Sequence, residues 1–548
     1  MKFCGLIALL AGCWFSSASQ AQTLTSSNLP IFKITTNGTY IVDEPKRMVG
    51  LEVIDNGPGK RNNLTDAPNG YNGKIGIEYR GSSSQTFPKK PYGFETWDST
   101  GNSVNIGLMG FPAESDWILN ANYNDKTMIR NFLVYSLASR MGRYASRTRF
   151  CEVVLDDQYQ GVYLFQEKIK RDKNRVNISN LKPTDNSGDA LTGGYIVKID
   201  KTTGSPAKSW YSPFLPDGRS KIAPLFLVEY PKIEDITDTQ FNYIKNFIIG
   251  FETALYSSDY LDTQKGFRKY IDEDSFVDYF ILTELAKPVD GYRLSTFMYK
   301  DKDSKGGKLN MGPAWDYDIA LGNGNYYDAF KPSGWQYQVN QLMPVPSTQE
   351  DPFKAPAWWT RLLTDIEFSK KIKTRWQDLR KGAFQTDKII AIVDSAATNL
   401  NEAQVRNFQR WNILGQYVWP NYFVGKSYLE EVNWLKDWIR QRLAWLDEQY
   451  QNFGVITGTN FFSARQVHLS PNPSDGSLLL DFELAQSSYL TVQVLDVTGR
   501  VVSILTNQFY EQGPHQISAL LGELPSGTYI VNYQATNQPP IQKKWIKL

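Results

Sequence analysis

Histidine and cysteine are almost missing from this chain, which has two histidines and three cysteines among its 548 residues. Both histidines, His468 and His515, lie near the C-terminus. Ser-His and Cys-His nucleophile pairs and histidine-ligated zinc are therefore excluded from the large central part of the chain. Any chemistry there must use carboxylates, lysine, arginine, tyrosine or an oxygen-ligated metal.

The cysteines are also poorly distributed for structural roles. Cys4 and Cys13 lie in an apolar N-terminal segment, which leaves Cys151 as the one thiol in the rest of the chain. A single thiol builds neither a disulfide framework nor a cysteine zinc site.

No later stretch is apolar over the roughly 20 residues that a membrane helix needs. The net charge of +2 argues against a polyanion as the main partner, so we do not expect nucleic-acid binding.

The N-terminal residues have the parts of a secretory signal peptide. One positive charge precedes an apolar run over residues 3–15, and Ser19–Gln20–Ala21 supplies a small-residue cleavage site. We expect residues 1–21 to be removed, leaving Gln22 first. An alternative exists, because Leu10–Ala11–Gly12–Cys13 resembles a lipoprotein box that would attach lipid to its cysteine.

Hydrophobic periodicity predicts an α+β chain with a change of pattern near its middle. Residues 22–235 are expected to be rich in strands, with one helix over residues 128–141. Residues 236–450 are expected to be mainly helical, apart from a strand pair at 297–300 and 308–311.

The C-terminal end has a different pattern from the central part. We predict a linker over residues 451–465, because the sequence there is polar and lacks periodicity. Short alternating segments separated by Gly and Pro turns follow, and they predict a small β-sandwich over residues 466–548.

Three carboxylates are candidates for chemistry. Asp290 follows a predicted helix that Pro288 ends, so it is expected on a loop. Asp316 and Asp318 flank Tyr317 just after a predicted strand, and alternate residues of an extended segment point the same way. Both carboxylates can then face one cation, and Mg²⁺ prefers one or two carboxylates plus phosphate oxygens and water. The alternative for each aspartate is a turn or a helix cap.

Two basic clusters are candidates for phosphate binding. The first is the small-residue loop Arg80–Gly81–Ser82–Ser83–Ser84 followed by Lys89–Lys90, where backbone N–H groups can cradle a phosphate and the cations can neutralise it. The second is the segment over residues 161–170, where alternation puts Lys168 and Lys170 on one face. An ordinary turn and a solvated strand edge are the respective alternatives.

Taken together, these segments resemble the CotH family of atypical kinases, named after a bacterial spore-coat protein. The matching motifs are collinear over about residues 70–330, with a helical tail to about 450. They are Arg80–Gly81–Ser82–Ser83–Ser84 with Lys89–Lys90–Pro91–Tyr92, Asp116–Trp117–Ile118–Leu119, Met128–Ile129–Arg130–Asn131, Gly161–Val162–Tyr163 with Glu167–Lys168–Ile169, Gly193–Gly194–Tyr195–Ile196, Glu284–Leu285 with Asp290–Gly291–Tyr292, and Gly312–Pro313–Ala314–Trp315–Asp316–Tyr317–Asp318.

The resemblance implies a two-lobed kinase-like fold that uses ATP and Mg²⁺ or Mn²⁺ to phosphorylate Ser or Thr of exported proteins. It implies that Asp290 is the catalytic aspartate, that Asp316 binds the metal and that Asp318 is a second ligand. The residues expected at the nucleotide are Arg80, Ser83, Ser84, Lys89 and Lys168. The chain differs from many relatives at Pro288, where they have Asn, and the second-metal Asn of kinases has no counterpart, although Ser295 lies nearby.

The C-terminal part resembles the type A sorting domain of the type IX secretion system of Bacteroidetes. The motifs are Leu469–Ser470–Pro471–Asn472–Pro473, Leu495–Asp496–Val497–Thr498–Gly499–Arg500, Leu524–Pro525–Ser526–Gly527–Thr528–Tyr529 and the ending Lys543–Lys544–Trp545–Ile546–Lys547–Leu548. The resemblance implies export across the outer membrane by that machinery, and then release or attachment at the cell surface.

Three functions remain open from the sequence. The first is an active extracellular protein kinase, which the presence of Asp290 and Asp316 favours. The second is a surface binding or adhesion protein that keeps the fold without phosphoryl transfer. The third is a polysaccharide hydrolase, which would need two acids about 5–10 Å apart across a sugar-sized groove, and the order of the motifs argues against it.

Overall fold

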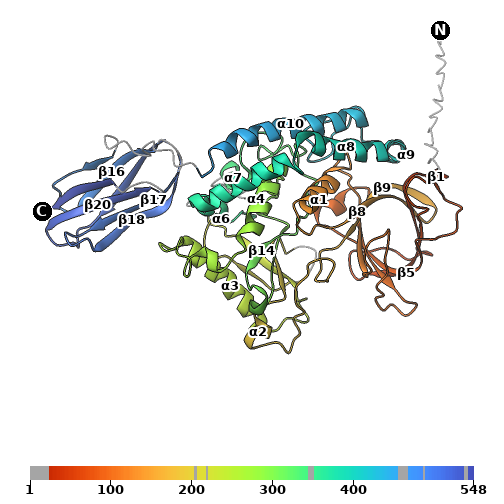
Figure 1. Ribbon diagram of the computed structural model, residues 1–548, viewed down its shortest axis with the longest axis horizontal. Helices are drawn as coiled ribbons and strands as arrows, with labels where there is room; N and C mark the ends of the chain where they lie inside the picture. Colours follow the sequence, from red (N-terminus) through yellow and green to blue (C-terminus); the bar gives the residue numbers. More distant parts are fainter. Residues whose placement is uncertain are drawn as a thin grey trace, which may run out of the picture.

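The computed structural model describes residues 24–202, 207–216, 220–343, 351–454, 467–484, 488–511, 513–535 and 541–548. Helices make up 27% and strands 28% of the fold, so the expected α+β class is confirmed. The expected signal peptide and residues 455–465 of the expected linker lie outside the described residues. Figure 1 shows a barrel at one end of the molecule, a sandwich at the other, and helices with a further sheet between them.

In the described N-terminal part, seven strands close into a barrel. Val49, Leu51 and Val53 alternate on β3 (Arg47–Ile54) and are buried, and Ile75 and Ile77 of the next barrel strand join them in the interior. The parallel pairing of the first barrel strand with the last closes the ring. In order around the barrel, the other strands are β2 (Ile31–Thr35), β5 (Tyr71–Tyr79), β6 (Tyr92–Trp97), β7 (Asp116–Asn120), β9 (Gln158–Glu167) and β8 (Thr148–Leu155).

A five-stranded antiparallel sheet follows the barrel. It includes the predicted strand pair, which is confirmed as β13 (Thr296–Lys300) and β14 (Leu309–Met311). Since β13 pairs with β10 (Tyr195–Ile199), the sheet combines strands from both sides of the change in sequence pattern near residue 235. On the other side of β10 lies β12 (Leu225–Tyr230), and the two edge strands are β11 (Ser209–Tyr211) and β14.

Helices pack on this sheet and on each other around the largest hydrophobic core of the described residues. The helix predicted at 128–141 is α1 (Arg130–Arg140). The long α3 (Asp238–Tyr256) begins at a capping box formed by Thr237 and Gln240, as the residue types favour. The remaining helices of eight or more residues are α4 (Glu273–Ala286), α7 (Ile366–Lys381), α8 (Thr386–Leu400), α9 (Ala403–Arg410) and α10 (Tyr428–Gln451).

Shorter elements connect these parts. They are the strand pair β1 (Ser26–Ser27) and β4 (Asn62–Asn63), and the short helices α2 (Gly188–Leu191), α5 (Val339–Leu342) and α6 (Trp358–Leu362).

The C-terminal part forms two antiparallel sheets around one core, as predicted from its alternation. Trp545 is fully buried in this core, and its Nε1 donates a hydrogen bond to Ser474 Oγ at 3.0 Å. One sheet contains β15 (His468–Ser470), β16 (Ser477–Leu484) and β19 (Gly513–Leu520), and the other contains β18 (Val501–Tyr510), β17 (Ser488–Leu495), β20 (Gly527–Ala535) and β21 (Ile541–Lys547).

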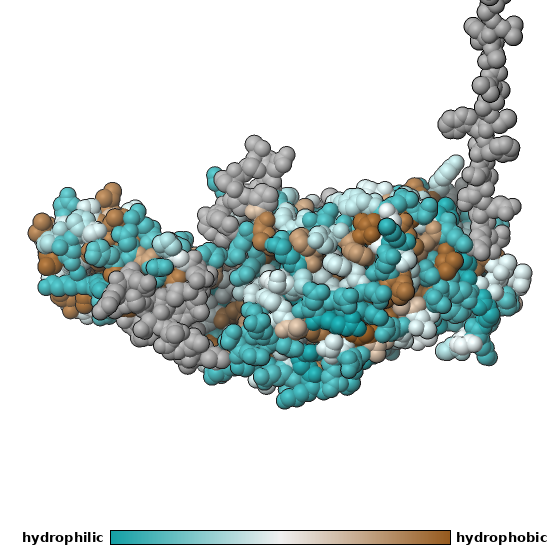
Figure 2. Space-filling view, turned by 90° about the horizontal axis from the view of Figure 1, so that it is seen from above, coloured by the Kyte–Doolittle hydropathy of each residue, from teal (hydrophilic) through white to brown (hydrophobic). Residues whose placement is uncertain are grey.

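The face of the molecule over α8, α9 and α10 is mostly hydrophilic. Exposed apolar side chains there, such as Val405 and Leu429, are scattered among polar ones (Figure 2). In the described part of the chain, no helix is both long and apolar enough to cross a lipid bilayer.

One carboxyl group is buried in the core beside the sheet without a cation within hydrogen-bond distance. Glu252 on α3 is 1% exposed and accepts hydrogen bonds from Trp358 Nε1 and Ser212 Oγ, each at 3.0 Å. Burial raises the pKa of Glu252 from 4.5 to about 7, although both hydrogen bonds oppose the shift. The folded chain therefore holds a proton here that the unfolded chain releases above pH 4.5.

We expect the free energy of unfolding to fall as pH rises from 4.5 to 7, because the folded state binds the extra proton in this window. The variant Glu252→Gln stays neutral. Relative to the wild type, it should gain stability between pH 5 and pH 8, by an amount on the order of 3 kcal/mol. Urea unfolding at several pH values measures this difference. The control Glu448→Gln changes an exposed glutamate on α10 and should show no such gain.

Candidate active site

Asp290 lies on the loop directly after α4, as predicted. The helix ends at Ala286, and Lys287 adopts a left-handed conformation with φ +46° that turns the chain away. Arg293 Nη2 donates to Asp290 Oδ1 at 2.8 Å, and Asp290 Oδ2 has no donor among the described residues. The Asp290 side chain is 26% exposed. One oxygen of this carboxylate is therefore held while the other is available to a ligand.

Asp316 and Asp318 come together, although not in the way the sequence pattern predicts. Asp316 has φ +66°, so the segment is not extended, and Tyr317 between them is buried. The two carboxyl groups lie close enough for the charge of Asp316 to act on that of Asp318. Burial and the charge of Asp316 raise the pKa of Asp318 well above its usual value. Ser295 Oγ donates to Asp316 Oδ2 at 3.4 Å.

Helix α1 holds the backbone of this segment. Tyr135 Oη accepts a hydrogen bond from the Asp316 N–H at 3.1 Å, and Asn131 Oδ1 accepts one from the Tyr317 N–H at 2.7 Å. Arg130 is 1% exposed, and its Nε donates to the Ala320 carbonyl at 3.0 Å. The conformation that presents Asp316 is therefore stabilised by one face of α1.

The charges of these loops act on each other. Burial raises the pKa of Asp290, and the charges of Asp316 and Asp200 add to the shift, while Arg293 opposes it. Asp200 follows β10, and burial together with the charge of Asp316 raises its pKa, against the effect of Lys198. Carboxylates after α4, β10 and β14 thus share one electrostatic environment that favours a cation.

Two basic residues border this group of carboxylates. Lys198 Nζ lies 3.1 Å from Glu229 Oε2 and 3.5 Å from Asp200 Oδ2. The guanidinium of Arg80, after barrel strand β5, lies 5.5 Å from the centre of the Trp315 ring. Burial lowers the pKa of Arg80, and the charge of Asp316 opposes this shift. Arg80 therefore connects the barrel to the segment that carries Asp316.

The loop after Arg80 is a tight turn. Ser83 and Ser84 begin a short 3₁₀ turn, with Ser83 exposed and Ser84 half-buried. Gly81 has φ +88°, and a Cβ there would lie 2.0 Å from Ser84 Oγ, so the turn requires glycine.

Residues 77–446 match the protein family described as "CotH kinase protein". The chain belongs to the CotH kinase family. Residues 468–548 match the family described as "Secretion system C-terminal sorting domain", which implies type IX secretion and a secreted or cell-surface location.

Other comparisons add little to the family match. No curated protein matches this CotH-family chain. Among solved structures, a DNA-bound alkylpurine DNA glycosylase AlkC from Pseudomonas fluorescens is similar over 34% of this chain and 54% of its own, about half its length. It has 14% identity and a TM-score of 0.13.

The remaining predicted nucleotide residues of this CotH-family chain lie in two different places. The exposed Lys168 and the Arg80 guanidinium both have Glu78 as a neighbour. Burial raises the pKa of Glu78, and the positive charges of Lys46, Lys168 and Arg80 oppose this shift. Lys89 lies elsewhere, under α9.

Contacts with α9 and the barrel surround the ammonium group of Lys89. It donates to the Val162 carbonyl and to Asn407 Oδ1, and it lies 4.7 Å from the centre of the Tyr163 ring. Burial lowers the pKa of Lys89 to about 7.

The residues of this CotH-family site fit a hard divalent cation. Within the described ranges, no three carboxylate, thiol or imidazole side chains are arranged as a ready-made metal site. The Asp316–Asp318 pair instead offers two carboxylates close together, and Mg²⁺ commonly uses one or two carboxylates with phosphate oxygens and water.

Sequence reasoning missed Asp200, Lys198 and Glu229. Their signal is the alternation of β10, whose residues Tyr195, Val197 and Ile199 are buried in the main core, so that Lys198 faces the other way. A lysine on that face and an aspartate directly after the strand mark the polar side of the sheet.

We expect Tyr135→Phe to lower the free energy of unfolding by about 1–3 kcal/mol, because the Asp316 N–H loses its acceptor. Amide exchange at Asp316 should become faster. The matched control is Tyr450→Phe, since the Tyr450 hydroxyl is buried without a hydrogen-bond partner among the described residues. Hydrogen exchange and urea unfolding of both variants test this. Equal losses in both would contradict the positioning role of Tyr135.

Proposed function

We propose that this chain is an exported protein kinase that transfers the γ-phosphoryl group of ATP to Ser or Thr hydroxyls of other exported proteins. The supporting observation is the convergence of Asp290 with Asp316 and Asp318, where the charge of Asp316 raises the pKa of both other carboxyl groups. In this proposal the barrel and the helical part act as two lobes, with Arg80 reaching from the first toward Asp316.

Each carboxylate has a separate role in the proposal. Asp290 Oδ2 orients the acceptor hydroxyl or takes its proton, while Arg293 fixes Oδ1. Asp316 and Asp318 hold Mg²⁺ or Mn²⁺, which when bound neutralises charge on the nucleotide phosphates. In this proposal Arg80, Ser83, Ser84 and Lys168 bind the phosphates, since Ser83 and Ser84 lie in the turn after Arg80 and Lys168 shares the neighbour Glu78 with Arg80.

Export fits the sorting domain. We propose that the mature protein begins near Gln22 and acts outside the cell, with the type IX machinery and its protein substrates as partners. Release and surface attachment both agree with the C-terminal match.

We expect Asp316→Ala to abolish metal-dependent nucleotide binding, because the carboxylate that anchors the cation is lost. Asp290→Ala should bind nucleotide nearly as the wild type does but transfer phosphate about a hundredfold more slowly or worse. Calorimetry with a non-hydrolysable ATP analogue and Mn²⁺, together with transfer of labelled phosphate, separates the two effects. A chelator should reproduce the Asp316→Ala result.

A matched control for these variants is Asp378→Ala, which removes a carboxylate with 61% side-chain exposure on α7. It should leave both binding and transfer unchanged. Wild-type transfer by Asp290→Ala would remove the kinase mechanism and favour a binding or adhesion protein that keeps the fold.

The two lysines should respond differently to the same change. Lys168→Met should raise the KM for ATP about tenfold, as expected for losing one charged hydrogen bond to a phosphate. Lys89→Met should leave this KM within about twofold. It should instead lower the free energy of unfolding by about 1–3 kcal/mol, because Asn407 and the Val162 carbonyl lose a buried donor. Kinetics and urea unfolding of both variants test this, and a large rise in KM for Lys89→Met would return Lys89 to the nucleotide site.

A further inference from the structure

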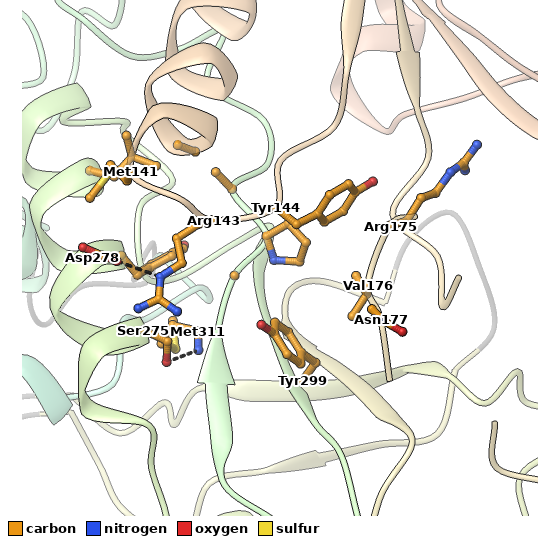
Figure 3. Close-up of a pocket in the computed structure, with 16 residues that line it drawn as sticks. Met141, Arg143, Tyr144, Arg175, Val176, Asn177, Ser275, Asp278, Tyr299 and Met311 are labelled. Carbon is orange, nitrogen blue, oxygen red and sulfur yellow. Dashed lines mark hydrogen bonds and ion pairs between the residues drawn. The ribbon is translucent and has the colours of Figure 1, made fainter. Parts of the chain in front are cut away.

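A cavity of about 170 Å³ lies between the end of α1, helix α4 and the β13–β14 pair. Figure 3 shows the side chains that surround it. Its walls are mainly apolar, with Met141 just after α1, Leu282 from α4 and Met311 from β14 among them. For comparison, a cavity of about 150 Å³ in another protein binds benzene. The space therefore suits one ring or one branched aliphatic group.

One wall of this cavity has excess positive charge. Arg143 Nε donates to Asp278 Oδ2 at 2.7 Å, and Arg375 Nε donates to the other oxygen of Asp278 at 2.7 Å. Two guanidinium groups thus share one carboxylate. The Nη atoms of Arg143 have no acceptor among the described residues, and the side chain is 34% exposed. A guanidinium with free Nη groups is suited to bind a carboxylate with two parallel hydrogen bonds.

A tyrosine completes the polar end of the cavity. The Tyr299 hydroxyl points from β13 toward the guanidinium of Arg143 across the cavity (Figure 3). No hydrogen-bond partner of this hydroxyl lies within the described ranges. Arg143 and Tyr299 therefore present unused donors to the same space.

We propose that this cavity binds a small carboxylic acid, with its carboxylate between Arg143 and Tyr299 and its ring or branched body against Met141 and Leu282. The guanidinium provides the charge, the hydroxyl adds a donor, and the apolar walls remove the body of the ligand from water. This site is separate from the carboxylate group described above. Tyr299 nevertheless lies near the segment that carries Asp316. Phe297, two residues earlier on β13, packs against Trp315, with 6.3 Å between the ring centroids.

The cavity also shares structure with the Asp316 segment. Residues 312–314 line it and lead directly to Asp316. Ala138, which also lines it, lies one turn along α1 from Tyr135, the acceptor of the Asp316 N–H. A ligand that packs on both should stabilise the conformation that presents Asp316, so the cavity is an effector site. This coupling rests on the proposed metal role of Asp316, whereas ligand binding does not.

Binding is tested on the full chain with benzoate and its neutral analogue benzamide, followed by NMR titration. Benzoate should bind saturably and at least about tenfold more tightly than benzamide, because hydrogen bonds between charged groups are stronger than those to a neutral amide. Arg143→Met should remove this preference, and Tyr299→Phe should weaken benzoate binding several-fold. Arg140→Met changes an exposed arginine at the end of α1, three residues before Arg143, and should have no effect.

No saturable benzoate binding, or equal affinity for benzoate and benzamide, would overturn the proposal. The milder Tyr299→Phe variant keeps the test decisive if Arg143→Met does not fold. Unchanged benzoate binding in both variants would also overturn it.

Coupling is tested by measuring Mn²⁺ affinity with and without saturating benzoate, using the spin resonance of free Mn²⁺. We expect about fivefold tighter binding or more, a usual size for coupling between two sites, and loss of this effect in Arg143→Met. Equal Mn²⁺ affinity in both conditions would overturn the effector role. Complete absence of Mn²⁺ binding would instead contradict the proposed kinase function, while the benzoate titration would still decide on the cavity.

Discussion

The candidate site depends on the contact between α1 and the segment that follows β14. Asp316 has a positive φ, which non-glycine residues rarely adopt without support. Its N–H and that of Tyr317 are held by Tyr135 and Asn131, and Arg130 binds the carbonyl of Ala320. These hydrogen bonds are buried or partly buried, and leaving a buried backbone group unpaired costs about 1–3 kcal/mol. The helix thus keeps a strained aspartate pointing out of the core, next to Asp318.

This constraint explains the distribution of charge around the site. Asp318 remains close to Asp316 because the backbone is fixed, and the pKa of Asp318 rises as a result of burial and of that neighbour. Asp290 and Asp200 approach from other elements and respond to the same charge. Such a group of carboxylates repels itself in the absence of a cation, so bound positive charge would relieve the repulsion. Arg80, Lys198 and Arg293 at its border compensate only part of it.

Local sequence patterns predicted the elements well and the site in part. The helix at 128–141, the strand pair around residue 300 and the loop position of Asp290 follow from periodicity and from Pro288, which are local signals. The partnership of Asp316 and Asp318 was predicted from an extended segment, yet it arises from a left-handed residue supported by α1. The contributions of Asp200 and Lys198 depend on the pairing of β10 with β13, which connects residues about a hundred positions apart and leaves no local pattern.

Lys89 and Lys168 illustrate the same limit of sequence reasoning. Both are lysines in matching family motifs, yet one is buried against Asn407 of α9 and the other is exposed near Glu78. The difference comes from α9, which covers the outside of β9: Trp411 just beyond it donates from Nε1 to the Gln160 carbonyl at 2.8 Å. Since α9 lies more than two hundred residues after either lysine, its effect on them depends on the tertiary fold. A basic residue in a phosphate-binding motif is therefore a candidate ligand only where no later helix supplies its ammonium group with buried acceptors.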